Sequence, residues 1–207
     1  LEVRRALRPD LRLLVMSATL DADAVARHLC DAETIRAEGR MFPVETRYLG
    51  DLPMTAAIGK ALAETAGDVL CFLPGEGEIR KIIEWSNDRM VEFLPLYGSL
   101  PKEEQDRVFA PSARRKVILA TSIAETSLTI EGITTVIDSG LMRVPRFSPG
   151  TGMTGLVTLP LTQDRAEQRR GRAGRVQAGV CYRLWTEAGE ASRPAKMPPE
   201  ILDADLC

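Results

Sequence analysis

Short apolar runs alternate with longer amphipathic stretches between residues 54 and 138, and this order limits the fold most strongly. Short, mostly apolar runs of this kind are typical of strands buried in a parallel sheet. The predicted helices are residues 54–66, 76–90 and 101–109, and the predicted strands are residues 69–73, 93–96, 116–120 and 134–138. Because strands that alternate with helices form right-handed βαβ units, we predict an α/β fold with a mostly parallel sheet flanked by helices.

The segments after residue 138 add a hairpin and a last strand. Glycines and prolines punctuate residues 141–161, which predicts a β-hairpin insertion rather than a helix. Residues 180–185 predict a last strand. The small residues and prolines that follow indicate that residues 188–207 connect to another domain.

The first 45 residues predict a separate piece of structure. Residues 11–16, LRLLVM, are expected to form a buried strand, residues 22–29 a helix and residues 34–37 another strand. Paired Gly and Pro residues between 39 and 53 indicate a domain boundary, which we place near residue 45. The second domain is then residues 46–187. The abrupt start and the unfinished end of the sequence suggest a fragment of a longer protein.

Composition excludes several classes of protein. With 44% hydrophobic residues the chain can bury a core, and its net charge of -2 argues against nonspecific nucleic-acid binding by the whole surface. Four cysteines without Cys-x-x-Cys spacing and a single histidine argue against a zinc site and favour reduced, cytoplasmic thiols. No apolar run has the length of a membrane span. Positive charge is concentrated in residues 143–183, with eight arginines, no lysine and two acids.

The densest part of this positive region is residues 168–175, QRRGRAGR. If the segment is a helix, Gln168, Arg172 and Arg175 share one face, while Arg169 and Arg170 point elsewhere. Two guanidinium groups on one face favour a polyphosphate ligand, because the planar fork binds phosphate oxygens in pairs. Glycine costs about 1 kcal/mol relative to alanine inside a helix, so the two glycines predict a need for close approach. A basic surface helix whose glycines only permit packing is the alternative.

Three strand-to-helix loops are candidate phosphate sites. They are Ser17-Ala18-Thr19, residues 98–101, and residues 121–130, which hold five hydroxyl groups in ten residues. Backbone N–H groups at helix starts and hydroxyl groups at strand ends can hold phosphates without reading bases. Helix caps and Ser/Thr turns explain the same residues without a ligand.

Taken together, segments SAT at 17–19, YGSLP at 97–101, residues 121–130 and QRRGRAGR at 168–175 resemble the DEAH/RHA family of superfamily 2 RNA helicases. Residues 1–10 and 197–202 look most like its bacterial HrpB branch. The resemblance covers essentially the whole chain. It implies two RecA-like lobes of a P-loop NTPase, of which the chain would hold the tail of the first and all of the second. No Walker A loop or DEAH box is present, so the residues that hold the triphosphate and Mg²⁺ would lie upstream.

The resemblance also implies roles around ATP. Arg172 and Arg175 correspond to the arginine fingers of the family, and Gln168 to its water-orienting glutamine. Phe109 would stack on adenine. Thr129 and Glu131 would contact the ribose, although the family usually has Asp where this chain has Glu131.

Further roles implied by the resemblance concern nucleic acid. Phosphates of single-stranded RNA, or of DNA, would be held by Ser99, Thr121, Ser122 and Thr126; the family usually has Asn at position 122. Ser17 and Thr19 would couple the nucleotide state to lobe movement, and the hairpin at 143–158 would separate strands. The implied activity is an ATP-dependent 3′-to-5′ RNA helicase, with the fragment alone inactive. The alternatives are a catalytically silent RecA-like binding module and a DNA-acting translocase.

Overall fold

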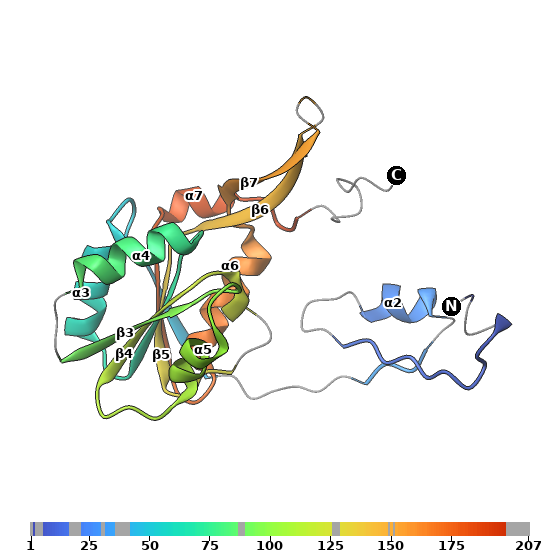
Figure 1. The fold of residues 1–207 in the computed structure, drawn as a ribbon, viewed down its shortest axis with the longest axis horizontal. Helices are drawn as coiled ribbons and strands as arrows, with labels where there is room; N and C mark the ends of the chain where they lie inside the picture. Colours follow the sequence, from blue (N-terminus) through green and yellow to red (C-terminus); the bar gives the residue numbers. More distant parts are fainter. Residues whose placement is uncertain are drawn as a thin grey trace. The chain divides into compact units, whose positions relative to one another are not determined.

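A computed structural model describes residues 2, 6–16, 22–29, 32–35, 42–86, 90–125, 129–148, 150 and 152–197. Figure 1 shows the course of the chain. The contacts divide it into two compact units, Leu1–Gly39 and Arg40–Cys207, which are described separately.

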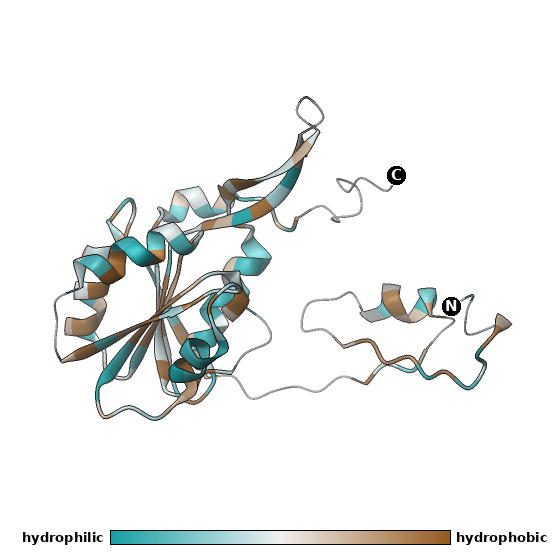
Figure 2. Ribbon diagram, in the orientation of Figure 1, coloured by the Kyte–Doolittle hydropathy of each residue, from teal (hydrophilic) through white to brown (hydrophobic). Residues whose placement is uncertain are grey.

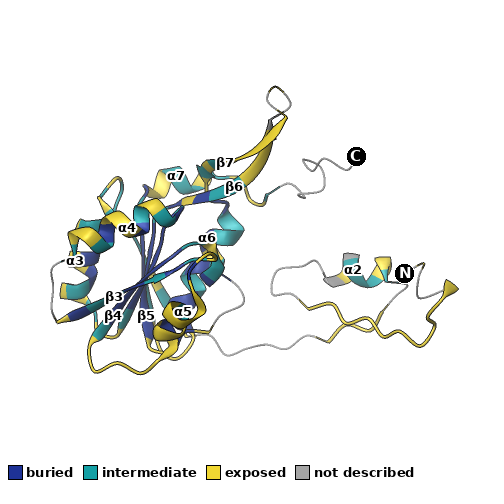
Figure 3. Cartoon of the chain, in the orientation of Figure 1, coloured by how far each residue is buried: buried dark blue, intermediate teal, exposed yellow. Residues whose placement is uncertain are grey.

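The first unit contains the predicted helix but not the predicted strands. Helix α2 spans Ala22–His28. Residues 11–16 form no strand and are exposed, with Leu14 at 81% and Met16 at 80% (Figure 3). A strand needs a neighbour to satisfy its backbone N–H and C=O groups, and the described part of this unit has none. Residues 34–35 are likewise not in a strand, and residues 36–37 lie outside the described range.

The second unit is built on a six-stranded sheet in which every pairing is parallel, in the order β1-β8-β5-β2-β4-β3. Its strands are β1 (Val44–Tyr48), β2 (Asp68–Phe72), β3 (Val91–Leu96), β4 (Arg115–Ala120), β5 (Ile133–Asp138) and β8 (Gly179–Arg183). The helices are α3 (Met54–Glu64), α4 (Glu76–Trp85), α5 (Lys102–Phe109), α6 (Gln163–Arg170) and α7 (Glu187–Ala191), with 3₁₀ turns η1 (Ser122–Ala124) and η2 (Gly171–Gly174). The predicted α/β class and mostly parallel sheet are confirmed.

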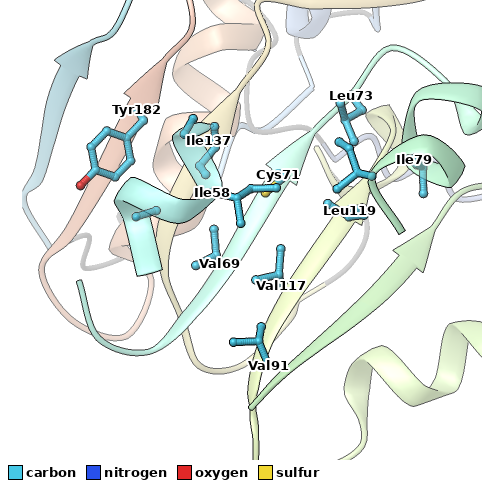
Figure 4. Close-up of a cluster of buried hydrophobic side chains, with 13 residues drawn as sticks. Ile58, Val69, Cys71, Leu73, Ile79, Val91, Val117, Leu119, Ile137 and Tyr182 are labelled. Atoms are coloured by element: carbon cyan, nitrogen blue, oxygen red, sulfur yellow. The ribbon is translucent and has the colours of Figure 1, made fainter. Parts of the chain in front are cut away.

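Helices cover both faces of this sheet, so its central strands are apolar on both sides (Figure 2). In β2, Val69 and Cys71 face a cluster formed with α3 and α4, which Figure 4 shows. Leu70 and Phe72 face the opposite cluster, which includes Val108 of α5 and residues of η1 and η2. The two larger clusters among the described residues therefore lie on opposite faces of the sheet, and a smaller third cluster contains Met142, Leu161, Ala166 and Trp185.

The sequence analysis did not identify β1 as a strand of the sheet. The Gly and Pro residues between 39 and 53 were interpreted only as a domain boundary, whereas Val44–Tyr48 pairs in register with β8. The boundary between the compact units falls at Gly39/Arg40, and β1 belongs to the second unit. Strand β1 is an edge strand of mixed polarity, so it lacks the apolar run that marks the buried strands.

The predicted hairpin is confirmed, and part of the segment after β8 is bound to the second unit. Strands β6 (Leu141–Ser148) and β7 (Met153–Pro160) pair antiparallel as a separate two-stranded sheet. After β8 the chain forms α7, and Arg193 donates hydrogen bonds to the carbonyls of Gly140 (2.8 Å) and Leu161 (2.9 Å). These hydrogen bonds hold the segment around Arg193 on the second unit, and residues 198–207 lie outside the described range.

Candidate functional site

The arginine-rich segment changes helix type in its middle. Helix α6 ends at Arg170 and continues as the 3₁₀ turn η2, so the prediction of one regular helix across residues 168–175 is wrong at Gly171. Helices often tighten to 3₁₀ geometry in their last turn, where side chains three residues apart eclipse one another. This geometry brings Arg172 and Arg175 to the same side, where both line a cavity of about 10 Å³ with Ile130. Gln168 lies a turn earlier, is half-buried and does not line it.

Arg172 and Arg175 occupy different environments although they are close. Arg172 is buried, and its guanidinium donates a hydrogen bond to the backbone carbonyl of Glu125. Burial, and secondarily repulsion from Arg175, lowers the pKa of Arg172 to about 10, so it remains a cation at neutral pH. Arg175 is exposed, and its Nη1 donates to Thr129 Oγ1 at 2.7 Å. Two neighbouring cations that repel each other are suited to binding a polyanion.

Arg169 points inward and holds this segment to the sheet. Its Nε donates to Glu125 Oε1 at 2.8 Å and its Nη1 to Asp138 Oδ1 at 2.7 Å, with all three side chains at most 5% exposed. The guanidinium also stacks on the Phe72 ring at 4.8 Å from the centroid. The sequence analysis did not identify Glu125 and Asp138 as partners of Arg169. Their positions could have indicated this role, because Glu125 is an acid in the hydroxyl-rich loop and Asp138 is an acid at the end of a buried strand.

Gly174 lies where the backbone of η2 meets the start of β1. A Cβ at this position would lie 2.5 Å from the Phe42 carbonyl oxygen and 2.7 Å from Val44 Cγ2. The Phe42 N–H also donates to the Gly174 carbonyl at 2.9 Å. For Gly174 the expected need for close approach is confirmed.

Three of the residues assigned to ATP, Phe109, Thr129 and Glu131, lie near the amino-terminal edge of the sheet. Helix α5 runs from the end of β3 back to the start of β4, so Phe109, its last residue, lies at that edge. Glu131 lies two residues before β5 begins, and Thr129 contacts Arg175. Val108, Ile130 and Ala173, which neighbour these residues along the chain, belong to one hydrophobic cluster. The core therefore brings α5, the loop before β5 and η2 together, with Phe109 42% exposed.

The residues assigned to nucleic acid lie at the opposite, carboxyl edge. Ser99 follows β3 and Thr121 and Ser122 follow β4, and these two strands are neighbours. The Thr121 N–H donates to the Leu96 carbonyl at 3.1 Å, which ties the two strand ends together. Ser99 Oγ donates to Glu76 Oε2 at 3.3 Å on the rim of a cavity of about 390 Å³ between α4, β3 and α5. Thr126, Ser17 and Thr19 lie outside the described residues.

Two other expectations concern metals and membranes. Where the structure is described, it contains no group of three His, Cys, Asp or Glu side chains that could hold a metal ion. The same part of the chain has no helix that combines the length and the apolarity needed to cross a membrane.

The chain has a parallel sheet covered on both faces by helices, and comparisons with known proteins identify it as a RecA-like helicase lobe. The family described as helicase conserved C-terminal domain matches residues 54–177, and the chain belongs to this family. The chain is 44% identical to the ATP-dependent RNA helicase HrpB of Escherichia coli K12, over 100% of the chain and 27% of HrpB. It is 40% identical to the Schizosaccharomyces pombe pre-mRNA-splicing factor ATP-dependent RNA helicase prp22, over 96% of the chain and 19% of prp22.

The solved structures lead to the same family. The crystal structure of Escherichia coli DEAH/RHA helicase HrpB matches with a TM-score of 0.90 and 44% identity, covering 99% of this chain and 28% of that one. The resemblance to HrpB-like DEAH/RHA helicases is thereby confirmed. The chain spans 27% of the length of HrpB and less of prp22.

Proposed function

We propose that this chain forms the end of a first RecA-like lobe and a complete second lobe of a cytoplasmic ATP-dependent RNA helicase that moves 3′ to 5′. The observation that carries the proposal is that Arg172 and Arg175 line one small cavity, with Arg175 bound to Thr129. The nucleic-acid residues lie at the carboxyl edge of the same sheet. The proposal therefore assigns the nucleotide and the nucleic acid to different groups of residues on the same sheet. The direction of movement rests on the resemblance to the family.

The nucleotide side fits a polyphosphate in its chemistry. Arg172 and Arg175 would bind oxygens of the terminal phosphate and stabilise the charge that develops there during hydrolysis. Gln168 would orient the attacking water. The exposed ring of Phe109 would stack on the adenine, the Glu131 carboxylate would accept a hydrogen bond from a ribose hydroxyl, and the Thr129 hydroxyl would donate or accept one.

The metal ion is assigned to other residues. The described part of the chain offers no cluster of three acidic or imidazole ligands, so Mg²⁺, which neutralises phosphate charge when bound, would be held by groups outside this part. The side chains of this chain would act on the phosphate only through their guanidinium groups.

The nucleic-acid side fits a strand bound by its backbone. Ser99, Thr121 and Ser122 offer hydroxyl groups at adjacent strand ends, and Thr126 is expected to add another. Contacts of this kind tolerate any base sequence. Ser17 and Thr19 would transmit the nucleotide state to lobe movement, and the β6–β7 hairpin, whose Leu156 is 69% exposed, would separate the strands.

ATP turnover and strand separation by the full-length protein test the proposal. We expect hydrolysis that single-stranded RNA stimulates, and separation of RNA duplexes with a 3′ overhang but not with a 5′ overhang. Stimulation by DNA alone would identify a DNA translocase instead. Absence of turnover with RNA, with DNA and with neither would contradict the assigned activity and favour a binding module.

A further inference from the structure

Lys116 is a buried lysine whose ammonium group, among the residues that the structure describes, donates to two backbone carbonyls. It is the second residue of β4 and is 7% exposed. Its Nζ donates to the carbonyl of Val108 at 2.9 Å and to the carbonyl of Ala110 at 2.8 Å. Its backbone N–H donates to Asp68 Oδ1 at 2.8 Å, which fixes the start of β4 against β2.

These two carbonyls belong to the residues on either side of Phe109. Val108 is fully buried, whereas Phe109, next to it, is 42% exposed and ends helix α5. The last carbonyls of a helix have no partner within the helix, and the negative end of its dipole attracts a cation. A single ammonium group that binds both carbonyls therefore holds the peptide units before and after Phe109, and with them the direction of its Cα–Cβ bond.

We propose that Lys116 is a positioning residue for the nucleotide site: it orients the ring of Phe109 for stacking on the base, without touching the nucleotide itself. The inference rests on the proposed role of Phe109. Burial of a lysine needs compensation by strong acceptors, and a methionine would fill the same space with no N–H donor. An apolar residue at position 116 would hold the core but leave the end of α5 free to move.

The test is a double-mutant cycle in the full-length protein, with the ATP KM and kcat measured at saturating RNA. Lys116→Met is expected to raise KM for ATP by about 2- to 10-fold and to leave kcat nearly unchanged. This change in KM is the size expected from the loss of one or two hydrogen bonds. In a Phe109→Ala background the same substitution should change KM by less than about twofold, because the ring that Lys116 orients is gone. Lys102→Met, at the exposed first residue of α5, is the matched control and should leave both constants unchanged.

The outcomes separate the two proposals. An equal rise in KM in both backgrounds, or no rise in either, would overturn the role of Lys116. A lower kcat with unchanged KM would also overturn it, since that pattern reports a smaller folded fraction. If Phe109→Ala alone leaves KM unchanged, the nucleotide role of Phe109 fails as well. If Lys116→Met does not fold, Lys116→Arg replaces it in the same cycle, because arginine keeps a cation with N–H donors. Its KM for ATP is expected to stay close to that of the unmodified protein. A rise in KM that persists in the Phe109→Ala background would count against the proposal.

Discussion

Arg169 Nη1 lies 2.7 Å from Asp138 Oδ1, and the two side chains are 1% and 0% exposed. The same guanidinium contacts Glu125, whose backbone carbonyl accepts a hydrogen bond from Arg172. Arg169 therefore connects α6, the end of β5 and the loop after β4, and it supports the segment that presents Arg172. Sequence reasoning placed Arg169 away from the phosphate-binding face, and the structure shows that it points into the core.

Replacing Arg169 should destabilise the fold. Arg169→Met leaves Glu125 and Asp138 buried without their cation, and breaking a buried pair in this way costs about 3 to 5 kcal/mol. Urea denaturation should show a correspondingly lower free energy of unfolding. Arg107→Met is the control, because Arg107 makes only an exposed pair with Glu92, worth about 0 to 1 kcal/mol. Similar unfolding free energies for the two variants would show that the buried network is not what holds α6.

Two glycine substitutions should have opposite effects on stability. Gly174→Ala places a methyl group 2.5 Å from the Phe42 carbonyl oxygen and is expected to cost about 1 to 3 kcal/mol. Gly59→Ala lies inside α3 with no other atom within 4 Å of the new Cβ, and should stabilise the chain by roughly 0.5 to 1 kcal/mol. Thermal unfolding of both variants measures the difference. A Gly174→Ala variant as stable as the unmodified chain would mean that η2 and β1 can move apart.

Phe109→Ala should weaken nucleotide binding more than it weakens the fold. The ring is 42% exposed. Its removal should therefore lower the free energy of unfolding by much less than the roughly 3 to 5 kcal/mol that removal of a buried phenylalanine ring costs. Loss of stacking on a base should lower ATP affinity by about 1 to 3 kcal/mol. Equilibrium binding and urea denaturation of the same variant provide both numbers. Unchanged affinity together with a full core penalty would identify Phe109 as core filling.

Residues 1–207 alone should not hydrolyse ATP. The arginine pair is present, but the described residues contain no cluster of metal ligands, and no Walker A loop occurs in the sequence. Phosphate release from purified chain, with and without RNA, measures this directly. Turnover well above that of a chain carrying Arg175→Ala would contradict a site divided between two lobes.

The second unit was largely predictable because its strands and helices carry strong local patterns. Runs such as Val117–Ala120 are apolar throughout because helices cover both faces of the sheet, and the hairpin follows from its glycines and prolines. Strand β1 was missed because an edge strand of mixed polarity has no such run. The run at 11–16 misled for the opposite reason: its apolar pattern is clear, but no partner strand is present among the described residues.

The candidate site was only partly predictable. The spacing of Arg172 and Arg175 was sufficient to place them together, but the change to 3₁₀ geometry at Gly171 and the inward direction of Arg169 depend on tertiary contacts. The same holds for Lys116, whose role depends on carbonyls that only the folded chain brings near it. Contacts between distant segments leave no periodic signal in the sequence.

The most direct test of the proposed function is the turnover number of full-length variants at the arginine pair. Arg175 is exposed and binds only Thr129 among the contacts described, so Arg175→Ala should preserve the fold, which circular dichroism can verify. Arg172→Ala is measured beside it, corrected for its folded fraction. At saturating RNA and ATP, kcat should fall by about 10³- to 10⁵-fold for each, with a much smaller change in ATP affinity.

Arg170→Ala, which removes a surface pair with Glu167, should keep kcat within a few-fold of the unmodified protein. Equal losses at positions 170, 172 and 175 would contradict the assignment of Arg172 and Arg175 as the groups that act on the phosphate.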